Sequence, residues 1–173
     1  NMLVGIAVQA ALFLRNAKLM RDVAVEANRR SQLQRFFSPA VAQQVMNEDV
    51  QLGGELRDGC VMFCDIVGFT SLSEKVGARE VIKCLNEYFG VMVGIILDEQ
   101  GTVDKFGGDA IMAVWGAPLA IEGDTGHALA CALRMQNAII AFNRNIVEHG
   151  AQPFVMGVGL HSGEFIAGNI GSK

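Results

Sequence analysis

Hydrophobic positions follow two different periods along this chain. Apolar residues recur every three or four positions over 79–99 and again over 124–150, which predicts two long amphipathic helices. Short apolar runs bounded by glycine or charged residues predict strands. Five such strands are expected, at 59–66, 102–106, 110–116, 154–163 and 164–171.

Each long helix has an apolar stripe that we expect to face the core. Gly101 lies just past the end of the first helix, whose stripe is Val81, Ile82, Leu85, Phe89, Met92, Val93 and Ile96. Asp124 is the expected N-cap of the second helix and Gly150 ends it. The stripe of this second helix is Ala128, Ala132, Met135, Ile139, Phe142 and Ile146.

The order of these elements predicts the fold. A strand, a helix, two strands joined at Gly107–Gly108, a second helix and further strand residues match the ferredoxin-like, split βαβ arrangement of the α+β class. Its sheet is antiparallel, its helices lie on one face, and its first and third strands are neighbours. We assign residues 36–173 to this domain.

Ahead of its first strand, Ser38–Pro39 predicts a short helix over 39–47 and Gly53–Gly54 predicts a loop.

A separate long helix is expected over residues 2–36, and residues 1–35 are assigned to it as a connector. Its apolar stripe is narrow and consists of Val8, Leu12, Leu19 and Val23. A narrow stripe suits a surface helix and equally suits a helix that pairs with a second copy, so both interpretations stay open.

Composition and charge exclude several classes of protein. Of the 173 residues, 51% are hydrophobic, so a folded domain is expected rather than a disordered one. The net charge is −4 and no basic run is present, so no nucleic-acid partner is expected. The apolar stretch Met2–Leu14 is shorter than the roughly 20 residues of a membrane span. No cleavage site follows it, so we expect neither membrane contact nor a signal peptide.

The reactive side chains outside the aspartates are interpreted as structural. Four cysteines are present, Cys60, Cys64, Cys84 and Cys131. None forms a Cys-x-x-Cys pair, so zinc binding is not expected. Cys60 and Cys64 point to one face of their strand and are interpreted as buried thiols of a cytoplasmic protein. His161 and Ser162 have no acid to orient them as a nucleophile pair and are interpreted as strand-end structure.

Two aspartates are expected to meet at one end of the sheet. Asp65 closes the first strand and Asp109 opens the third. Mg²⁺ binds carboxylate, water and phosphate oxygens, and two such ions can hold the attacking and leaving oxygens of a displacement. Either aspartate alone is better interpreted as a turn residue, whereas the two together, beside glycine-rich backbone, favour a metal site.

The joint after Asp65 is a candidate anion site. Gly68 allows a tight turn, and Thr70 is the expected N-cap of a helix from about Ser71. N–H groups at such a helix start can bind phosphate. Lys105 lies in the strand before the double glycine, where a solvated edge lysine is the ordinary interpretation.

Three longer motifs stand out in the sequence: VMFCDIVGFTSLSE, VDKFGGDAIMAVWGAP and GVGLHSGEFIAGNIGS. They resemble successive signatures of class III nucleotidyl cyclases, the adenylyl and guanylyl cyclase catalytic domains. The resemblance covers about residues 36–173, and RFFSPAVAQQV resembles the element that precedes the domain in many bacterial members. It implies conversion of ATP to 3′,5′-cyclic AMP and pyrophosphate in signal transduction, with the substrate 3′-hydroxyl attacking the α-phosphate.

The resemblance also implies roles for the residues around the phosphates. Asp65 and Asp109 match the two metal-binding aspartates, and the Ile66 carbonyl matches a backbone ligand. Two ions, Mg²⁺ or Mn²⁺, are implied for each site. The phosphate-binding turn of the family matches the amides of Gly68, Phe69 and Thr70.

Lys105 matches the family's purine-reading position, where adenylyl members carry lysine and guanylyl members carry glutamate. A lysine donates to adenine N1, whereas guanine N1–H needs an acceptor. In the family the sites lie between two head-to-tail domains, and one site takes its aspartates and its lysine from different protomers. The resemblance therefore implies a homodimer.

The two ends of the chain add further expectations. The chain stops at Lys173, before the family's second purine-reading residue, its transition-state Asn and Arg and a phosphate-binding Arg. We expect the catalytic domain to be incomplete and the chain by itself to have little or no cyclase activity. VGIAVQAALFLRNAKLMRDV resembles the last helix of a GAF sensor domain, and a membrane-anchored parent is the alternative.

Other functions are weighed against adenylate cyclase. FGGDA also suits a diguanylate cyclase, but Ala110 and Ile111 stand where that family has Glu and Phe. A guanylate cyclase is a further alternative. A non-catalytic regulatory module is expected to lose a metal aspartate, whereas this chain keeps both Asp65 and Asp109.

Overall fold

The computed structural model describes residues 15, 18–25, 27–28, 54–75, 77–148 and 152–168. Two compact units are present, Asn1–Arg35 and Phe36–Lys173. All described residues of the first unit are helical, and the side chains of Leu19 and Val23 are exposed. Val8, Leu12 and the short helix predicted over 39–47 lie outside the described residues. No helix in the described part of the chain is long and apolar enough to cross a membrane.

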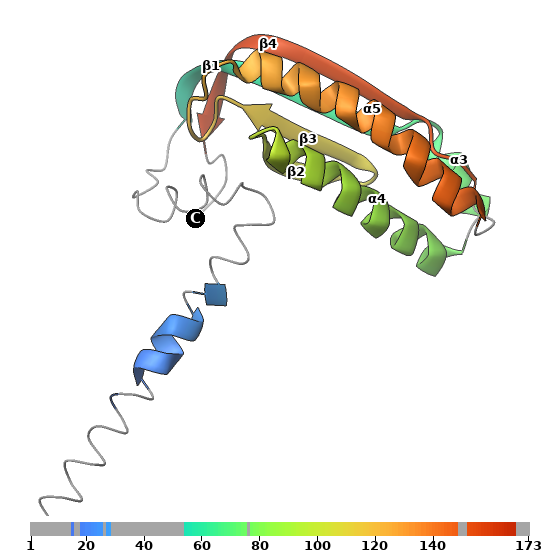
Figure 1. Ribbon diagram of the computed structural model, residues 1–173, viewed down its shortest axis with the longest axis horizontal. Coiled ribbons are helices and arrows are strands. Elements are labelled where there is room, and N and C mark those ends of the chain that lie inside the picture. Colours follow the sequence, from blue (N-terminus) through green and yellow to red (C-terminus); the bar gives the residue numbers. More distant parts are fainter. Residues whose placement is uncertain are drawn as a thin grey trace, which may run out of the picture. The chain divides into compact units, whose positions relative to one another are not determined.

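The second unit is built on one antiparallel sheet. Its elements follow in the order β1 (Gly54–Ile66), α3 (Phe69–Lys75), α4 (Ala78–Asp98), β2 (Thr102–Gly107), β3 (Ala110–Trp115), α5 (Asp124–Glu148) and β4 (Met156–Gly168). The strand order is β2–β3–β1–β4, and α4 and α5 lie together on one face of the sheet (Figure 1). The predicted ferredoxin-like fold and the predicted contact between the first and third strands, β1 and β3, are confirmed.

The helix stripes form the core against this face. All six residues predicted for α5 are buried. In α4 the buried residues are Tyr88, Met92 and Ile96. Ile82, which the stripe prediction included, is 59% exposed because it lies at the edge of this buried arc, near the start of the helix. Tyr88, which the prediction omitted, is completely buried.

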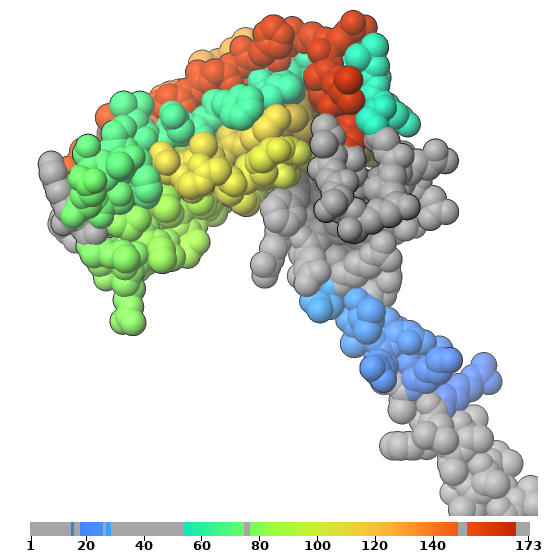
Figure 2. Space-filling model, turned by 180° about the vertical axis from the view of Figure 1, so that it is seen from behind, coloured from blue at the N-terminus to red at the C-terminus, as the bar shows by residue number. Residues whose placement is uncertain are grey.

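The opposite face of the sheet, called the open face below, is not covered by α4 or α5. Cys60, Met62 and Cys64 of β1 point to the helices and are at most 1% exposed, which confirms that the two cysteines share a face. Phe63 lies between them on the open face and is 57% exposed. Figure 2 shows β4, β1, β3 and β2 side by side at the surface on this side of the molecule.

Two predicted strand boundaries are wrong. The strands predicted at 154–163 and 164–171 form a single strand, β4, because β1 pairs with it without interruption from Gly54↔Gly168 to Ile66↔Met156. The same pairing draws Gly54 into β1, where a loop was predicted. Polar residues such as Glu55 and Arg57 give this extension no hydrophobic pattern, so only the pairing reveals it.

Two backbone hydrogen bonds cap the C-terminal end of α4. The N–H of Gly101 donates to the Ile96 carbonyl at 2.8 Å, and the N–H of Gln100 donates to the Leu97 carbonyl at 3.1 Å. These are the two bonds of a Schellman motif. The left-handed residue of the motif is Gln100, with φ of 59°, and not the glycine that the sequence suggests.

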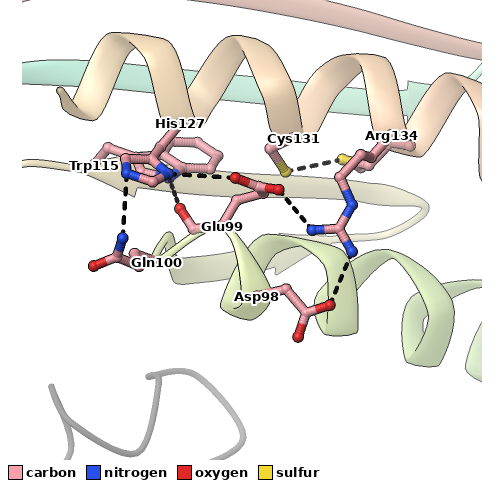
Figure 3. A network of polar contacts seen from close by, with 8 residues as sticks. Asp98, Glu99, Gln100, Trp115, His127, Cys131 and Arg134 are labelled. Carbon is pink, nitrogen blue, oxygen red and sulfur yellow. Dashed lines mark hydrogen bonds and ion pairs between the residues drawn. The ribbon is translucent and has the colours of Figure 1, made fainter.

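A set of polar contacts, called the Glu99 network below, ties this helix end to α5 and β3 (Figure 3). The Glu99 carboxylate accepts from Arg134 at 2.6 Å and from His127 Nδ1 at 3.3 Å. The same Arg134 donates to Asp98 at 2.9 Å, and the buried Trp115 indole donates to the Glu99 carbonyl at 2.8 Å. The network therefore holds the helix layer and the sheet together at one end of the domain.

Candidate active site

The structure brings the two predicted metal aspartates to one end of the sheet. Asp65 is the next-to-last residue of β1, and Asp109 lies in the turn between β2 and β3. The backbone N–H of Ile66, directly after Asp65, donates to Asp109 Oδ2 at 3.1 Å. This hydrogen bond fixes the Asp109 carboxylate against the end of β1, as the strand order predicted.

A glycine of β4 leaves room for the Asp65 carboxylate. Gly157 pairs directly with Asp65 across the β1–β4 ladder. A Cβ atom at position 157 would lie 3.1 Å from Asp65 Oδ1, so any side chain there would crowd the carboxylate. The role of Gly157 could not be predicted from the sequence, since it depends on a strand register that only the fold supplies.

The donor set at this end suits a hard cation. Asp65 and Asp109 form no ion pair with any residue that the structure describes. Within the same residues no group of three acidic, histidine or cysteine side chains gathers around a metal position. An ion held here would need oxygen ligands from water or a substrate, which is how Mg²⁺ is usually bound beside phosphates.

The negative charges of Asp65 and Asp109 also affect the pKa of a side chain in the core beneath the sheet. Burial raises the pKa of Tyr88, which lies under the sheet; the neighbouring Cys64 raises it further, as do, to a lesser extent, the charges of Asp109 and Asp65. Tyr88 therefore stays a neutral phenol, and the hydroxyl group lies 3.9 Å from Cys64 Sγ.

The turn predicted to bind phosphate follows β1 directly. Gly68 has φ of 73°, a conformation that favours glycine, and its carbonyl accepts the first helical bond of α3 from Leu72 at 3.2 Å. The helix begins at Phe69, so Thr70 lies inside the first turn and the predicted N-cap role of Thr70 is wrong. The N–H groups of Gly68, Phe69 and Thr70, which are predicted to bind phosphate, all precede the helical ladder.

Lys105 lies on β2, the edge strand, and its side chain is 68% exposed. It pairs in register with Met112 of β3, which in turn pairs with the exposed Phe63 of β1. Lys105 therefore shares the open face with Asp65. Its ammonium forms an ion pair with Asp104 at 3.1 Å, and no ion pair joins it to either metal aspartate within the described residues.

The other reactive side chains are engaged in the fold. All four cysteines are free thiols, and burial raises the pKa of Cys131 to about 12, which leaves it protonated at neutral pH. Ser162 Oγ lies 3.0 Å from Thr125 Oγ1 of α5. His161 pairs with Val61 and Ser162 with Cys60 in the middle of β4, so their predicted place at a strand end is wrong. The two side chains point to opposite faces of β4 and are not a nucleophile pair.

Comparison with known families identifies the domain. The model of the adenylate and guanylate cyclase catalytic domain matches residues 55–173. The chain belongs to this family. The cyclase domain is 33% identical over 142 residues to a protein of Anabaena cylindrica named adenylate cyclase. The aligned region covers 79% of this chain and 27% of that protein. The chain spans between 17% and 27% of the length of the curated relatives it matches.

Solved structures of both substrate types resemble the cyclase domain. The guanylyl cyclase Cya2 is 42% identical with a TM-score of 0.68, and the match covers 70% of this chain and 62% of that one. The adenylyl cyclase CyaB from P. aeruginosa is 31% identical with a TM-score of 0.67 and coverages of 70% and 63%. Substrate preference must therefore be argued from this chain's own residues.

Proposed function

We propose that the protein is an adenylate cyclase, which converts ATP to 3′,5′-cyclic AMP and pyrophosphate in signal transduction. The observation that carries this choice is that Lys105, which matches the family's purine-reading position in the sequence, lies exposed on the open face. Its ammonium group donates hydrogen bonds and accepts none, so it suits adenine N1 and repels guanine N1–H.

The reaction forms one P–O bond and breaks another. The ribose 3′-oxygen bonds to the α-phosphorus, the bond to the β-phosphate oxygen breaks, and pyrophosphate leaves while the 3′-hydroxyl proton passes to solvent. The turn amides of Gly68, Phe69 and Thr70 bind the phosphate chain next to Asp65. Their place directly after β1 sets the phosphates at the carboxylate end of the sheet.

Asp65, Asp109 and the Ile66 carbonyl are the proposed ligands of two divalent ions, Mg²⁺ or Mn²⁺. The chemistry that these ions supply when bound is the neutralisation of charge on the attacking and leaving oxygens. The hydrogen bond from Ile66 N–H to Asp109 orients one carboxylate in advance, and Gly157 leaves space for the other. Both aspartates are thereby pre-positioned by the sheet itself.

The active unit in this proposal is a homodimer. The open face exposes Phe63 in the same row as Lys105, with Met112 between them, and a partly apolar sheet face of this kind favours association with another surface. The exposed Leu19 and Val23 of the first unit suit the pairing of two connector helices, which would carry a signal from a GAF-like sensor domain. Sedimentation of the full-length protein measures this association.

One observation favours a second candidate, guanylate cyclase. The match to Cya2, which is described as a guanylyl cyclase, has the higher identity of the two solved structures compared above. Lys105 argues against this candidate because glutamate is the residue expected for guanine. A diguanylate cyclase lacks support at Ala110 and Ile111, and a purely regulatory module lacks support because both aspartates are present.

Product analysis separates these candidates. The full-length protein is incubated with ATP or GTP and either Mg²⁺ or Mn²⁺, and the products are identified by mass spectrometry. Cyclic AMP from ATP supports the proposal. Cyclic GMP or cyclic di-GMP as the main product replaces it with the corresponding alternative, and no turnover with any nucleotide favours the regulatory module.

A further inference from the structure

The strand that carries Lys105 contains a β-bulge at Asp104. Thr102 and Val103 pair with Val114 and Ala113 of β3, and the next pair is Lys105 with Met112. Asp104 is therefore the extra residue of β2 and has no partner position on β3. A bulge of this kind changes the direction of the side chains that follow it.

The bulge decides on which face Lys105 lies. Val103 pairs with Ala113, and both are at most 1% exposed on the helix side of the sheet. In a regular strand Lys105, two positions later, would share that buried face. The register instead places Lys105 opposite Met112, in the same row as the exposed Phe63.

The residue after the lysine confirms the change of side. Phe106 pairs with Ile111, which is completely buried, and the Phe106 ring lies 4.8 Å from the ring of Phe89 on α4. Phe106 thus faces the helices, where regular alternation from Val103 would have put Lys105. If Asp104 instead paired with Met112 in a regular ladder, the lysine and the phenylalanine would exchange faces.

Asp104 also contacts the lysine directly. Its Oδ2 lies 3.1 Å from Lys105 Nζ, and the two side chains are 42% and 68% exposed. One of the three ammonium N–H donors is then directed to Asp104, which leaves two for a ligand. A long, flexible lysine side chain is held in one region of the open face by this contact.

We propose that Asp104 is a positioning residue for nucleotide recognition, and that its carboxylate holds the ammonium group of Lys105 on the open face, to which the bulge turns it. The inference rests on the proposed purine-reading role of Lys105. It adds a determinant of nucleotide preference that lies outside the proposed metal ligands Asp65 and Asp109 and the phosphate turn.

The test uses Asp104→Asn in the full-length protein, with steady-state kinetics on ATP and GTP. Asparagine keeps the size of the side chain and removes its charge. We expect KM for ATP to rise about two- to fivefold, the range that an exposed ion pair is worth, with kcat changed less than about twofold. The preference for ATP over GTP should fall by the same factor as KM rises.

A double-mutant cycle assigns the effect to Lys105. Asp104→Asn should cause no further change in a Lys105→Ala background. The matched control is Glu55→Gln, which removes the carboxylate of another exposed ion pair of the sheet, with Arg57, and should leave both nucleotides' kinetics unchanged.

The outcomes distinguish failure of the positioning role of Asp104 from failure of the base-reading role of Lys105. If Lys105→Ala alters KM and preference while Asp104→Asn alters neither, the positioning role is wrong and the proposed function stands. An equal effect of Asp104→Asn with and without Lys105 also overturns the positioning role. If Lys105→Ala itself changes nothing, Lys105 does not read the base, and the inference falls together with that part of the proposed function.

Discussion

The domain uses its charges in two contrasting ways. In the Glu99 network the carboxylates of Asp98 and Glu99 both receive hydrogen bonds from Arg134, and Glu99 is also bonded to His127. At the other place, Asp65 and Asp109 lie close in the fold without any ion pair to the described residues. One cluster satisfies its charges internally, and the other leaves them available.

This difference separates structural from functional carboxylates. A carboxylate that contacts arginine lowers the energy of the folded chain but has little capacity left for a ligand. Two neighbouring carboxylates without a cation repel one another, which a fold tolerates where a bound cation compensates. The four predictions below test this contrast, from the largest expected effect to the smallest.

The largest effect is expected at the carboxylates without ion pairs. Asp65→Ala or Asp109→Ala should lower cyclic nucleotide production by the full-length protein at least about a hundredfold, because charge on the phosphates is no longer neutralised. The melting temperature should stay close to that of the parent. The control from the other cluster is Asp98→Ala, which should keep turnover, and unchanged turnover in the Asp65 or Asp109 variant would refute the metal assignment.

Substitutions of Lys105 and of Arg134 should also have different effects. Lys105→Glu should lower the ratio of kcat/KM for ATP to that for GTP by about ten- to a hundredfold, since a charged hydrogen bond to the base is replaced by repulsion. Arg134→Gln should keep that ratio and lower the melting temperature instead. An unaltered nucleotide preference in Lys105→Glu would remove this lysine from base reading.

Removal of the network's central carboxylate should affect stability alone. Glu99→Ala leaves Arg134 with one carboxylate and His127 without its acceptor, and we expect a loss of about 1–2 kcal/mol in the free energy of unfolding. Urea denaturation measures this loss. Glu55→Ala, at the exposed Arg57 pair, should cost about 0.5 kcal/mol or less, and an equal loss in both variants would show that the network adds nothing to a surface pair.

The smallest expected effect is on the stability of the domain at acidic pH. Arg134 chiefly, and His127, hold the pKa of Glu99 below its ordinary value of 4.5. The unfolded chain then binds a proton at a pH where the folded chain does not, so this stabilisation is present above pH 4.5 and is lost as the pH falls through the lower, folded-state pKa. Unfolding free energies of the parent and Glu99→Gln, measured from pH 7 to pH 3.5, should converge with falling pH, and a constant difference would contradict this account.

Periodic patterns predicted the elements well where burial is regular. The α5 stripe from Ala128 to Ile146 is buried as expected because one side of that helix faces the sheet throughout. The expected meeting of Asp65 and Asp109 followed from strand order, and Ile66 N–H contacts Asp109. The roles of these residues in metal binding stay predictions.

Features set by register were beyond sequence reasoning. The bulge at Asp104 breaks the two-residue alternation on which strand prediction depends. Its only trace in the sequence is that Val103 and Lys105, two positions apart, differ so strongly in polarity. Gly157 acquires its role from the residue across the ladder, and Gln100 takes a conformation usually occupied by glycine. None of these follows from local propensity.

The thirteen-pair ladder between β1 and β4 has a consequence for the order of folding. It joins the first strand of the domain to the last one described, with α3, α4, β2, β3 and α5 between them in the chain. Such distant pairings form late, since the intervening chain must first be brought together. Asp65 therefore gains its neighbour Gly157 only after β4 has left the ribosome, and a nascent chain that already holds the β2–β3 hairpin still has no complete site.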